Sequence, residues 1–586
     1  MCSILGYINT NLSYSDVVDL NYSMSHRGPD DSTVVEYKFK NKKLFLAHNR
    51  LAIQDLDEKA NQPMENDRFV IVFNGEVYNH FEMRQELNIN FRTHSDTETL
   101  LWSFTCFGIE NTINKMNGMF AIALFDKINH KLYLIRDRVG IKPLYYRFEN
   151  GQFSFSSDTI ALNDKIRDDD SLAKFMVFGY VTDEQTYYKN IFKLKPAHYL
   201  IFDGENIDIK RYWNLPIEKI DISFDEAVDE VERLMLDSIS KRLLSDVEVG
   251  SFLSGGVDSS LVSAMMAKIS SKQIKTFTIG FEDKKYNEAG FAKDVAKHIN
   301  SNHFEYYFKA NDVLELLEDF DKFYDEPFGD ASALPTMLLS KFTKDKVTVA
   351  LSGDGGDELF LGYDRYFFTQ EYYNRLKQVP FKSLVSSAFS FIPNDKLNKM
   401  SYPMKNLTKQ NLYAVISSAL KPWDVTKLFN REYLDFLELS NYNKNFESIE
   451  DFSKFDFYRY LPDDILTKVD RASMAYSLEA RVPMLDYRIV EFAYSLPEDI
   501  KLFKGKKSIL KEILYKYVPK EMIDRPKMGF GVPLQEWFRG ELKDVLFDKV
   551  NSLDEKFNKD YILKIFDKHQ KGYNYEYVLW NIMRVK

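Results

Sequence analysis

The sequence has few cysteines and no long apolar run, and these two shortages exclude several classes of protein. Its 586 residues include two cysteines, Cys2 and Cys106, too few for a disulfide framework or a cysteine-rich zinc site. No stretch approaches the roughly 18 uninterrupted apolar residues that a membrane-spanning helix needs. The first residues, MCSILGYINT, lack the basic start and the apolar core of a signal peptide. We therefore expect a cytoplasmic protein without a membrane partner.

An excess of positive charge and the common nucleotide-binding motifs are also lacking. Lys and Arg number 78 against 88 Asp and Glu, so the formal net charge is −10, which argues against general nucleic-acid binding. No Walker A pattern occurs, and the glycine-rich turn that begins at Ser254 is not a GxGxxG fingerprint. The chain also contains no repeat of fixed period and no low-complexity tract.

What is present divides into two parts with different strand patterns. The first part is rich in β-branched and aromatic runs of strand length: KLFLAH, RFVIVFNGEVYN, MFAIALFD, KLYLIRD, PLYYRF and QFSFSS. Turn formers such as Asn74-Gly75 and Glu149-Asn150-Gly151 separate them, and helical spacing covers 96–107. This part is predicted to be an α+β domain built on antiparallel sheets.

The second part begins near Tyr212. A long amphipathic helix is predicted from Phe224, followed by short apolar strands within 247–256, 274–283 and 345–358, with a helix over 259–269. Strand, glycine-rich turn, helix and strand in succession indicate a parallel α/β sheet, and the chain from about Tyr366 is predicted to be mostly helical. We place the boundary at about 205–215, which gives domains at 2–210 and 211–586.

Cys2 is a candidate nucleophile. Removal of the initiator methionine makes Cys2 the N-terminal residue, so that its thiol and a free α-amine belong to one residue. The amine has a reference pKa of about 7.7–8.0, which suits a general base, and the deprotonated thiol is nucleophilic. By itself, a small apolar residue at position 2 is as readily accidental as catalytic.

The context of Cys2 resembles the class II glutamine amidotransferases. The matching segments, in the family's order, are MCSILGYI, Ser25–Asp30, Asn49–Ile53, Asn74–Asn79, Ser95–Glu98 and Asn117–Ala121. The resemblance implies glutamine hydrolysis through a Cys2 thioester. It implies that Arg50 binds the glutamine α-carboxylate, Asp96 its α-ammonium, Asn74 and Gly75 the oxyanion, and that Glu76 lines the pocket. Alone, Asn74-Gly75 would be read as a hairpin turn. Cys106 lies in an apolar helical pattern, and we expect it in the core.

A glycine-rich turn in the second part predicts a phosphate site. The turn Ser254-Gly255-Gly256-Val257-Asp258-Ser259-Ser260 ends a predicted strand and opens a helix. In such a turn, glycines allow the backbone to approach a phosphate closely, and serine hydroxyls can donate hydrogen bonds to it. The N-terminus of the helix also favours anions. The complete turn resembles the pyrophosphate loop of ATP pyrophosphatases. A second loop, Ser352-Gly353-Asp354-Gly355-Gly356-Asp357-Glu358, also follows an apolar strand, and its carboxylates suit Mg²⁺. We expect ATP at Ser254, Gly255, Gly256, Asp258, Ser259, Ser260, Ser352 and Gly353, with the metal at Asp258 and Asp357.

The remaining motifs resemble the glutamine-hydrolysing asparagine synthetases. They are Leu461–Arg471, which leads into SMAYSLEARVPMLD, and Gly505–Leu510. The resemblance implies an N-terminal nucleophile domain (an αββα sandwich) followed by an α/β ATP-pyrophosphatase domain with a helical C-terminal part. It implies a catalytic lysine at Lys507, with Lys506 as the alternative, and places Asp354 and Lys468 on the acceptor side.

The family reaction would use glutamine, ATP, Mg²⁺ and aspartate to give asparagine, glutamate, AMP and pyrophosphate, and family members often form homodimers. The main alternative is a different carboxylate acceptor, such as a sugar uronate. It stays open because this chain differs from the best-known aspartate-specific bacterial branch at two positions. That branch carries an arginine near the position of Asp330, which is missing here, and tends to have glutamate where this chain has Asp354. Two other classes are disfavoured. Glutamine amidotransferases that make phosphoribosylamine or glucosamine phosphate should lack SGGVDSS, which is present here. A β-lactam-forming synthetase needs no glutaminase, whereas this chain keeps the segments around Cys2. A catalytically inactive relative should have lost Cys2, Asp258 or the lysine.

Overall fold

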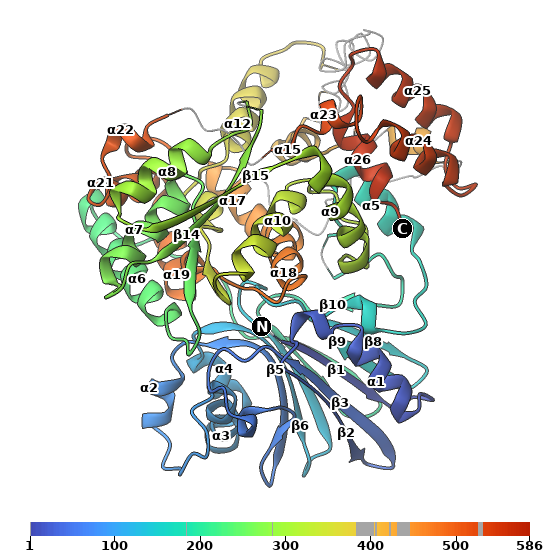
Figure 1. Cartoon of the computed structure of the whole chain (residues 1–586), viewed down its shortest axis with the longest axis vertical. Helices are drawn as coiled ribbons and strands as arrows, with labels where there is room; N and C mark the ends of the chain where they lie inside the picture. The colour runs from blue at the N-terminus through green and yellow to red at the C-terminus, as the bar shows by residue number, and fades with distance from the viewer. Residues whose placement is uncertain are drawn as a thin grey trace.

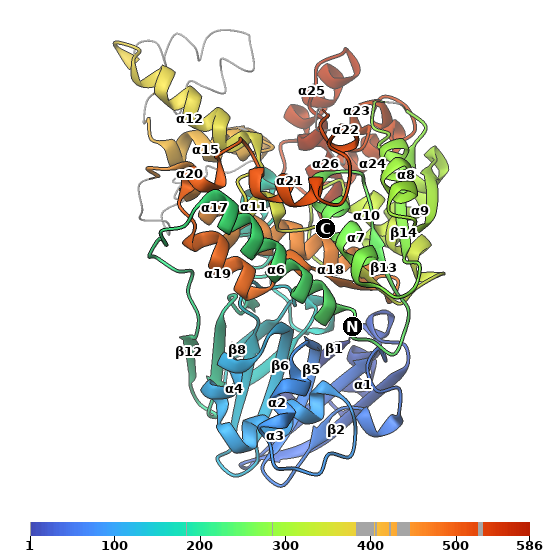
Figure 2. The same cartoon turned by 90° about the vertical axis from the view of Figure 1, so that its left-hand side faces the viewer.

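The computed structural model describes residues 2–182, 184–283, 285–382, 404, 407–420, 424–429, 446–525 and 531–586. The chain folds into two halves, with the N-terminal half below and the remainder above it in Figure 1. In both views the start of the chain lies where the two halves meet (Figures 1 and 2). Among the described residues, no helix combines the length and apolarity required to cross a bilayer.

The N-terminal half is a sandwich of two six-stranded antiparallel sheets. The first has the order β10-β8-β9-β1-β3-β2, with β1 at Ser3–Ile8, β2 at Asp31–Phe39, β3 at Lys42–Arg50, β8 at Tyr145–Glu149, β9 at Gln152–Ser156 and β10 at Phe192–Lys193. The second has the order β12-β11-β7-β6-β5-β4, with β4 at Met64–Glu65, β5 at Phe69–Val77, β6 at Gly118–Asp126, β7 at Lys131–Arg136, β11 at His198–Phe202 and β12 at Ile207–Arg211.

Alternation of apolar side chains builds the layers of this sandwich. Ile4 and Leu46 of the first sheet meet Val72 and Leu134 of the second in a fully buried core. The outer face of the second sheet packs on α3 (Asp96–Phe107) and α4 (Ile109–Lys115). Helix α1 (Tyr14–Tyr22) packs on the first sheet's side, whereas α5 (Asp169–Phe178) packs on helices of the second half (Figure 1). The predicted αββα arrangement is confirmed.

The second half contains a five-stranded parallel sheet with the order β15-β14-β13-β16-β17. Its strands are β13 at Val249–Phe252, β14 at Lys275–Phe281, β15 at Asn302–Phe308, β16 at Val349–Leu351 and β17 at Glu479–Arg481. In the described part of this half, the α-helices before β17 are α6 (Phe224–Arg242), α7 (Val257–Ile269), α8 (Ala289–His298), α9 (Ala310–Phe323), α10 (Ala333–Lys344), α11 (Gly356–Leu359), α12 (Asp364–Lys377), α15 (Lys409–Ser417), α16 (Val425–Leu428), α17 (Ile449–Tyr458) and α18 (Leu466–Met474).

Helices complete the C-terminal part, as predicted. They are α19 (Tyr487–Ser495), α20 (Glu498–Lys501), α21 (Ser508–Tyr515), α22 (Lys520–Ile523), α23 (Leu534–Trp537), α24 (Lys543–Ser552), α25 (Lys559–Gln570) and α26 (Glu576–Arg584). A further short helix, α2 (His80–Gln85), belongs to the first half. The predicted boundary at 210/211 falls at the end of β12, twelve residues before the N-cap of α6 at Ser223.

Two local expectations were wrong. Asn74 and Gly75 do not form a turn: they lie inside β5, opposite Ala121 and Phe120 of β6. Cross-strand pairing with β6 therefore overrides the turn preference of the Asn-Gly pair. Cys106 is exposed on α3 instead of buried in the core, because the apolar stripe that packs on the second sheet is formed by Leu100, Leu101 and Phe104.

Two candidate active sites

The first candidate site surrounds Cys2, which directly precedes the central strand β1. Cys2 is 8% exposed, and its backbone nitrogen donates a hydrogen bond to the Asn74 Oδ1 atom at 3.1 Å. Met1 lies outside the described residues. If Met1 is removed, this nitrogen becomes the α-amine. Burial raises the pKa of the Cys2 thiol, so a base is needed to generate the thiolate.

Strand β5 presents Asn74 to Cys2, and Gly75 follows it in the same strand. The Asn74 Nδ2 atom donates to the Ser157 hydroxyl at 3.4 Å, which orients the side-chain amide. Gly75 has a φ of +153°, and a Cβ atom there would lie 2.0 Å from the Met119 carbonyl oxygen. Only glycine fits this position, because any side chain would collide with the backbone of β6.

Arg50 ends β3, and the loop after it holds its guanidinium group. The Nη1 atom donates to the Asp57 carbonyl at 2.9 Å and to the Asn61 side chain at 2.6 Å, while Nη2 donates to the Asp55 carbonyl. Arg50 is only 6% exposed. The loop thus fixes a planar cation of the kind that binds carboxylates.

Two acidic side chains accompany this cation. Asp96, at the start of α3, accepts the Val77 backbone N–H at 2.9 Å, and burial raises its pKa to about 6. Glu76 accepts a hydrogen bond from Gln54 at 2.5 Å and lies 3.6 Å from the guanidinium group of Arg481 in the second half. Burial, and then the charge of Glu479, raise the pKa of Glu76.

Residues of the second half reach the surroundings of Cys2, and no pattern in the sequence pointed to these contacts. Arg27 donates to the Cys2 carbonyl at 3.3 Å and pairs with Asp470 of α18 at 2.9 Å. Arg481 pairs with Glu479 at 2.6 Å. All four of these charged side chains are buried. Arg27 and Asp470 both stand in segments that resemble the family, but only the folded chain joins them.

The second candidate site lies at the carboxyl ends of β13 and β16. The Ser254 backbone N–H and hydroxyl lie 3.1 and 2.9 Å from the Ser259 hydroxyl, which closes the turn in front of α7. Gly255 has a φ of +76°, and a Cβ atom at Gly353 would lie 2.8 Å from the Ser259 nitrogen. Because β13 and β16 are neighbouring parallel strands, the two glycine-rich loops pack against each other.

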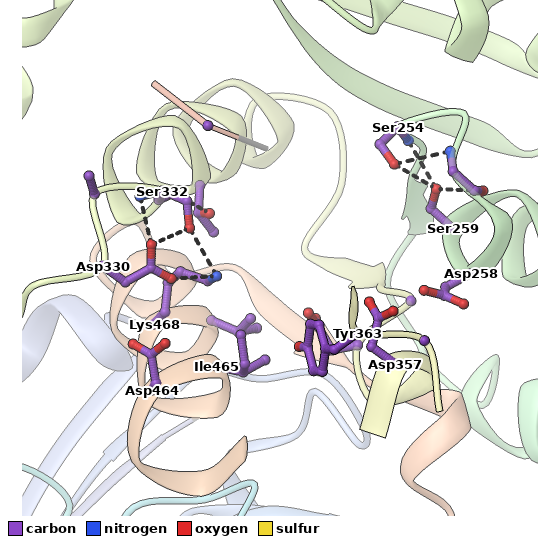
Figure 3. A pocket seen from close by; sticks show the side chains of 18 of the residues that line it. Ser254, Asp258, Ser259, Asp330, Ser332, Asp357, Tyr363, Asp464, Ile465 and Lys468 are labelled. Atoms are coloured by element: carbon purple, nitrogen blue, oxygen red, sulfur yellow. Dashed lines mark hydrogen bonds and ion pairs between the residues drawn. The ribbon is translucent and has the colours of Figure 1, made fainter. Parts of the chain in front are cut away.

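These loops open into a cavity of about 1190 Å³. Of the residues predicted for this half, the following line it: Ser254, Gly255, Gly256, Asp258, Ser259, Ser352, Gly353, Asp354, Asp357, Lys468, Lys506 and Lys507. Ser260 does not line it; its side chain is fully buried behind the loop in α7. Figure 3 shows Ser254, Ser259, Asp258 and Asp357 at one end of the cavity, and Asp330, Ser332, Lys468 and Asp464 at the other.

The geometry distinguishes the two adjacent lysines. The Lys507 Nζ atom lies 2.5 Å from Asp258 and 2.7 Å from Asp357. Burial by itself would lower the pKa of Lys507, but these two carboxylates raise it above its usual value. Lys506 instead pairs with the exposed Asp364.

The far end of the cavity carries a second charged group. Lys468 Nζ lies 2.9 Å from Asp330 and 3.0 Å from the Ser332 hydroxyl. Asp464 stands in a π-helical turn, Leu461–Ile465, directly before α18, and π turns are frequent at functional sites. Burial, and then the nearby Asp330, raise the pKa of Asp464. No motif in the sequence identified Asp330 or Asp464 as members of this group, although Asp464 lies within the family-like segment Leu461–Arg471.

The carboxylates of this cavity bear on metal binding. Within the described ranges, no group of three or more His, Cys, Asp or Glu side chains is arranged to hold an ion. The carboxylates of Asp258 and Asp357 nevertheless both pair with the Lys507 ammonium group, so the two side chains share one cation position. A pair of carboxylates that share their metal with substrate phosphates is a common magnesium arrangement, so these residues fit Mg²⁺ bound together with ATP.

Comparison with known proteins gives matches over both halves. A family profile described as a glutamine amidotransferase domain matches residues 1–213, and one described as asparagine synthase matches residues 230–586. A putative glutamine-hydrolysing asparagine synthetase of Methanocaldococcus jannaschii is 35% identical over 510 residues, which cover 81% of this chain and 98% of the relative. Asparagine synthetase 1 of Bacillus subtilis is 31% identical, over 97% of this chain and 93% of the relative.

The solved structures that match include the glutamine phosphoribosylpyrophosphate amidotransferase of B. subtilis with ADP and GMP. It is 16% identical, with a TM-score of 0.28, over 45% of this chain and 63% of that one. A likeness this weak says nothing about the activity of the chain.

Proposed function

The chain belongs to the family of glutamine-hydrolysing asparagine synthetases, which are ATP-dependent carbon–nitrogen ligases, and from that premise we propose that it converts aspartate to asparagine through an acyl-adenylate. An oxygen of the aspartate β-carboxylate attacks the α-phosphorus of ATP, and the bond to pyrophosphate breaks. Ammonia from glutamine then attacks the acyl carbon, loses a proton, and expels AMP. AMP is needed because a carboxylate has no good leaving group.

Residues 2–210 are proposed to release the ammonia. The Cys2 thiolate, formed with the α-amine of processed Cys2 as base, attacks the glutamine side-chain carbonyl. The carbon–nitrogen bond then breaks, the leaving nitrogen takes up the proton and departs as ammonia, and water hydrolyses the Cys2 thioester to glutamate. The Asn74 amide and the Gly75 N–H stabilise the oxyanion, which the contact between Asn74 and the Cys2 nitrogen supports. Arg50 binds the α-carboxylate and Asp96 the α-ammonium group, and Glu76 lies at the edge of this site nearest the second half.

Residues 211–586 are proposed to bind ATP and to activate the acceptor. The observation that carries this proposal is the single cavity that joins two serine- and glycine-rich loops, the Asp258–Lys507–Asp357 cluster and the Asp330–Lys468 pair. The loop from Ser254 to Ser259 faces the phosphates, and the Lys507 ammonium offsets charge on the departing pyrophosphate. Asp258 and Asp357 would hold Mg²⁺, which neutralises phosphate charge when bound. Ser260 acts only through the packing of the loop.

The charges at the far end of the cavity favour aspartate over a uronate. Aspartate presents both a carboxylate and an ammonium group beside the reacting carboxylate. Lys468 offers a cation for the former, while Asp330 offers an anion and Asp464, whose pKa is raised, a carboxyl acceptor for the latter. A sugar uronate has no ammonium group, so the two carboxylates would face hydroxyls. Lys468 also supplies a cation beside Asp330, where the aspartate-specific branch carries arginine. Asp354, which accepts from the Ser352 hydroxyl at 2.6 Å, lines the cavity on this acceptor side.

The deciding experiment uses aspartate labelled with ¹⁸O in its β-carboxylate, together with glutamine, ATP and Mg²⁺. An acyl-adenylate requires one labelled oxygen to appear in AMP, in proportion to the asparagine formed. Label in inorganic phosphate would indicate an acyl-phosphate instead. Pyrophosphate release that does not depend on aspartate would point to another acceptor, and a parallel reaction with a uronate would identify it. Chelation of Mg²⁺ should stop pyrophosphate release and leave glutamine hydrolysis intact.

A further inference from the structure

The segment of the first half that directly follows Arg50 contacts the second half. Asp246 lies between α6 and β13, and its backbone N–H donates to the Ile53 carbonyl at 2.9 Å. Its carboxylate accepts a hydrogen bond from the Asp55 backbone N–H at 2.7 Å. Asp246 thus makes two hydrogen bonds to the turn formed by residues 53–57, one on either side of Gln54.

The same turn holds the guanidinium group of Arg50, through the carbonyls of Asp55 and Asp57. Asp55 adopts the left-handed conformation, with a φ of 54°. A non-glycine residue persists there when surrounding contacts fix it. One such contact comes from Asp246, and another from the His94 backbone N–H, which the Asp55 carboxylate accepts at 2.5 Å.

Packing fixes one side of this turn but not the other. Ile53 packs with Leu51 against Val349, Val247 and Val249, at the amino ends of β13 and β16. The opposite side borders a cavity of about 380 Å³ between the halves, lined by Gln54, Asp55, Leu56, Phe81 and His94 from the first half and by Leu244, Ser245 and Asp246 from the second. Hydrogen bonds, rather than close packing, therefore hold the turn where it borders this cavity.

We propose that Asp246 is a positioning residue for glutamine: it lets the synthetase half fix the 53–57 turn and thereby orient Arg50 toward the glutamine α-carboxylate. The inference rests on the proposed function, because it takes Arg50 as the group that binds this carboxylate. The glutamine site then depends on both halves, although every residue proposed to bind glutamine belongs to the first.

The first test is the kinetics of Asp246→Ala. We expect KM for glutamine to rise about three- to tenfold, the effect of losing one charge-assisted hydrogen bond at an exposed position. Synthesis from ammonium chloride should stay unchanged, because it bypasses the glutamine site. Asp246→Asn keeps an acceptor oxygen and should recover most of the loss. Glu248→Ala is the matched control: it removes the same charge two residues away, from a side chain that pairs with Lys275 and is 68% exposed.

The second test separates positioning from general loosening. Cys2 is alkylated either by a diazoketone analogue of glutamine, which carries the α-carboxylate, or by iodoacetamide, which does not. Asp246→Ala should slow inactivation by the analogue at sub-saturating concentration and leave the iodoacetamide rate at the wild-type value. Equal changes with both reagents would mean that the whole site has altered, and would overturn the inference.

The remaining outcomes are also decisive. An unchanged KM in Asp246→Ala, or an equal effect of Glu248→Ala, would overturn the role of Asp246 while leaving the proposed function in place. A parallel loss of ammonia-dependent synthesis would show that the variant disturbs the synthetase half, which also contradicts a role confined to glutamine. Wild-type protein that releases no glutamate from glutamine would overturn the proposed function and this inference together.

Discussion

Replacing Lys507 by methionine tests the proposed synthetase site most directly, and the chain provides its own control. Methionine keeps the length and most of the volume of the side chain but removes the charge that lies 2.5 Å from Asp258 and 2.7 Å from Asp357. The backbone at position 507 has a φ of 54°, and lysine and methionine bear this conformation equally, so the substitution isolates the charge. Lys506→Met is the control, because its pair with Asp364 is solvent-exposed.

The expected magnitude follows from the surroundings of each lysine. Lys507 is 7% exposed, so its charge acts in a poorly screened site. Removing one preorganised electrostatic contact from a transition state costs about 10²–10³ in kcat, or roughly 2.7–4 kcal/mol. A Coulomb energy of about 4 kcal/mol for unit charges 4 Å apart at an effective dielectric constant of 20 has the same size. The exposed Lys506 pair is worth at most about 1 kcal/mol.

The assay is aspartate-dependent pyrophosphate release with ammonium as nitrogen donor, and glutamine hydrolysis is measured on the same preparations. Lys507→Met should lose pyrophosphate release by about a hundredfold or more and retain glutaminase activity, whereas Lys506→Met should stay close to wild type. Because the pKa of Lys507 is raised, its charge persists across the working pH range and adds no pH dependence. A variant at Lys507 that retains activity, or a larger loss at Lys506, would refute the assignment.

Four further predictions address the rest of the molecule. Cys2→Ala should abolish glutamine-dependent synthesis and leave ammonia-dependent synthesis intact; loss of both would contradict two separate sites. Since the free-enzyme pKa of Asp96 is raised to about 6, its anion is lost as pH falls through that value, so kcat/KM for glutamine should decline below about pH 6 in the wild type. Asp96→Asn should make kcat/KM low at every pH, and a persistent inflection would exclude Asp96 as its source. Lys468→Met should raise KM for aspartate by about tenfold or more, as expected for a lost charge-assisted contact, without changing glutaminase kinetics; an unchanged KM would remove Lys468 from the acceptor site. Arg481→Met leaves the buried Glu479 without its guanidinium partner and should cost about 3–5 kcal/mol, seen as a lower denaturation midpoint; an unchanged midpoint would contradict it.

Contiguous residues determined much of this protein's organisation and chemistry. Runs of β-branched and aromatic residues predicted six of the twelve strands of the sandwich, β3 and β5 to β9. The succession of strand, glycine-rich turn and helix predicted the parallel sheet, because composition and turn chemistry are properties of neighbouring residues. Cys2 and the turn from Ser254 to Ser260 were found for the same reason: each carries its chemistry within a few adjacent positions.

Tertiary structure decided which distant residues meet, and in which direction each side chain points. Pairing with β6 placed Asn74 and Gly75 inside a strand, and the packing of α3 left Cys106 exposed. The fold directed Lys507, and not its neighbour, to Asp258, which is 249 residues away. It also joined Arg27 to Asp470 and Asp246 to Asp55 across the two halves, over separations of 443 and 191 residues. Sequence spacing does not encode such contacts, because they depend on the packing of whole layers and on the docking of one half against the other.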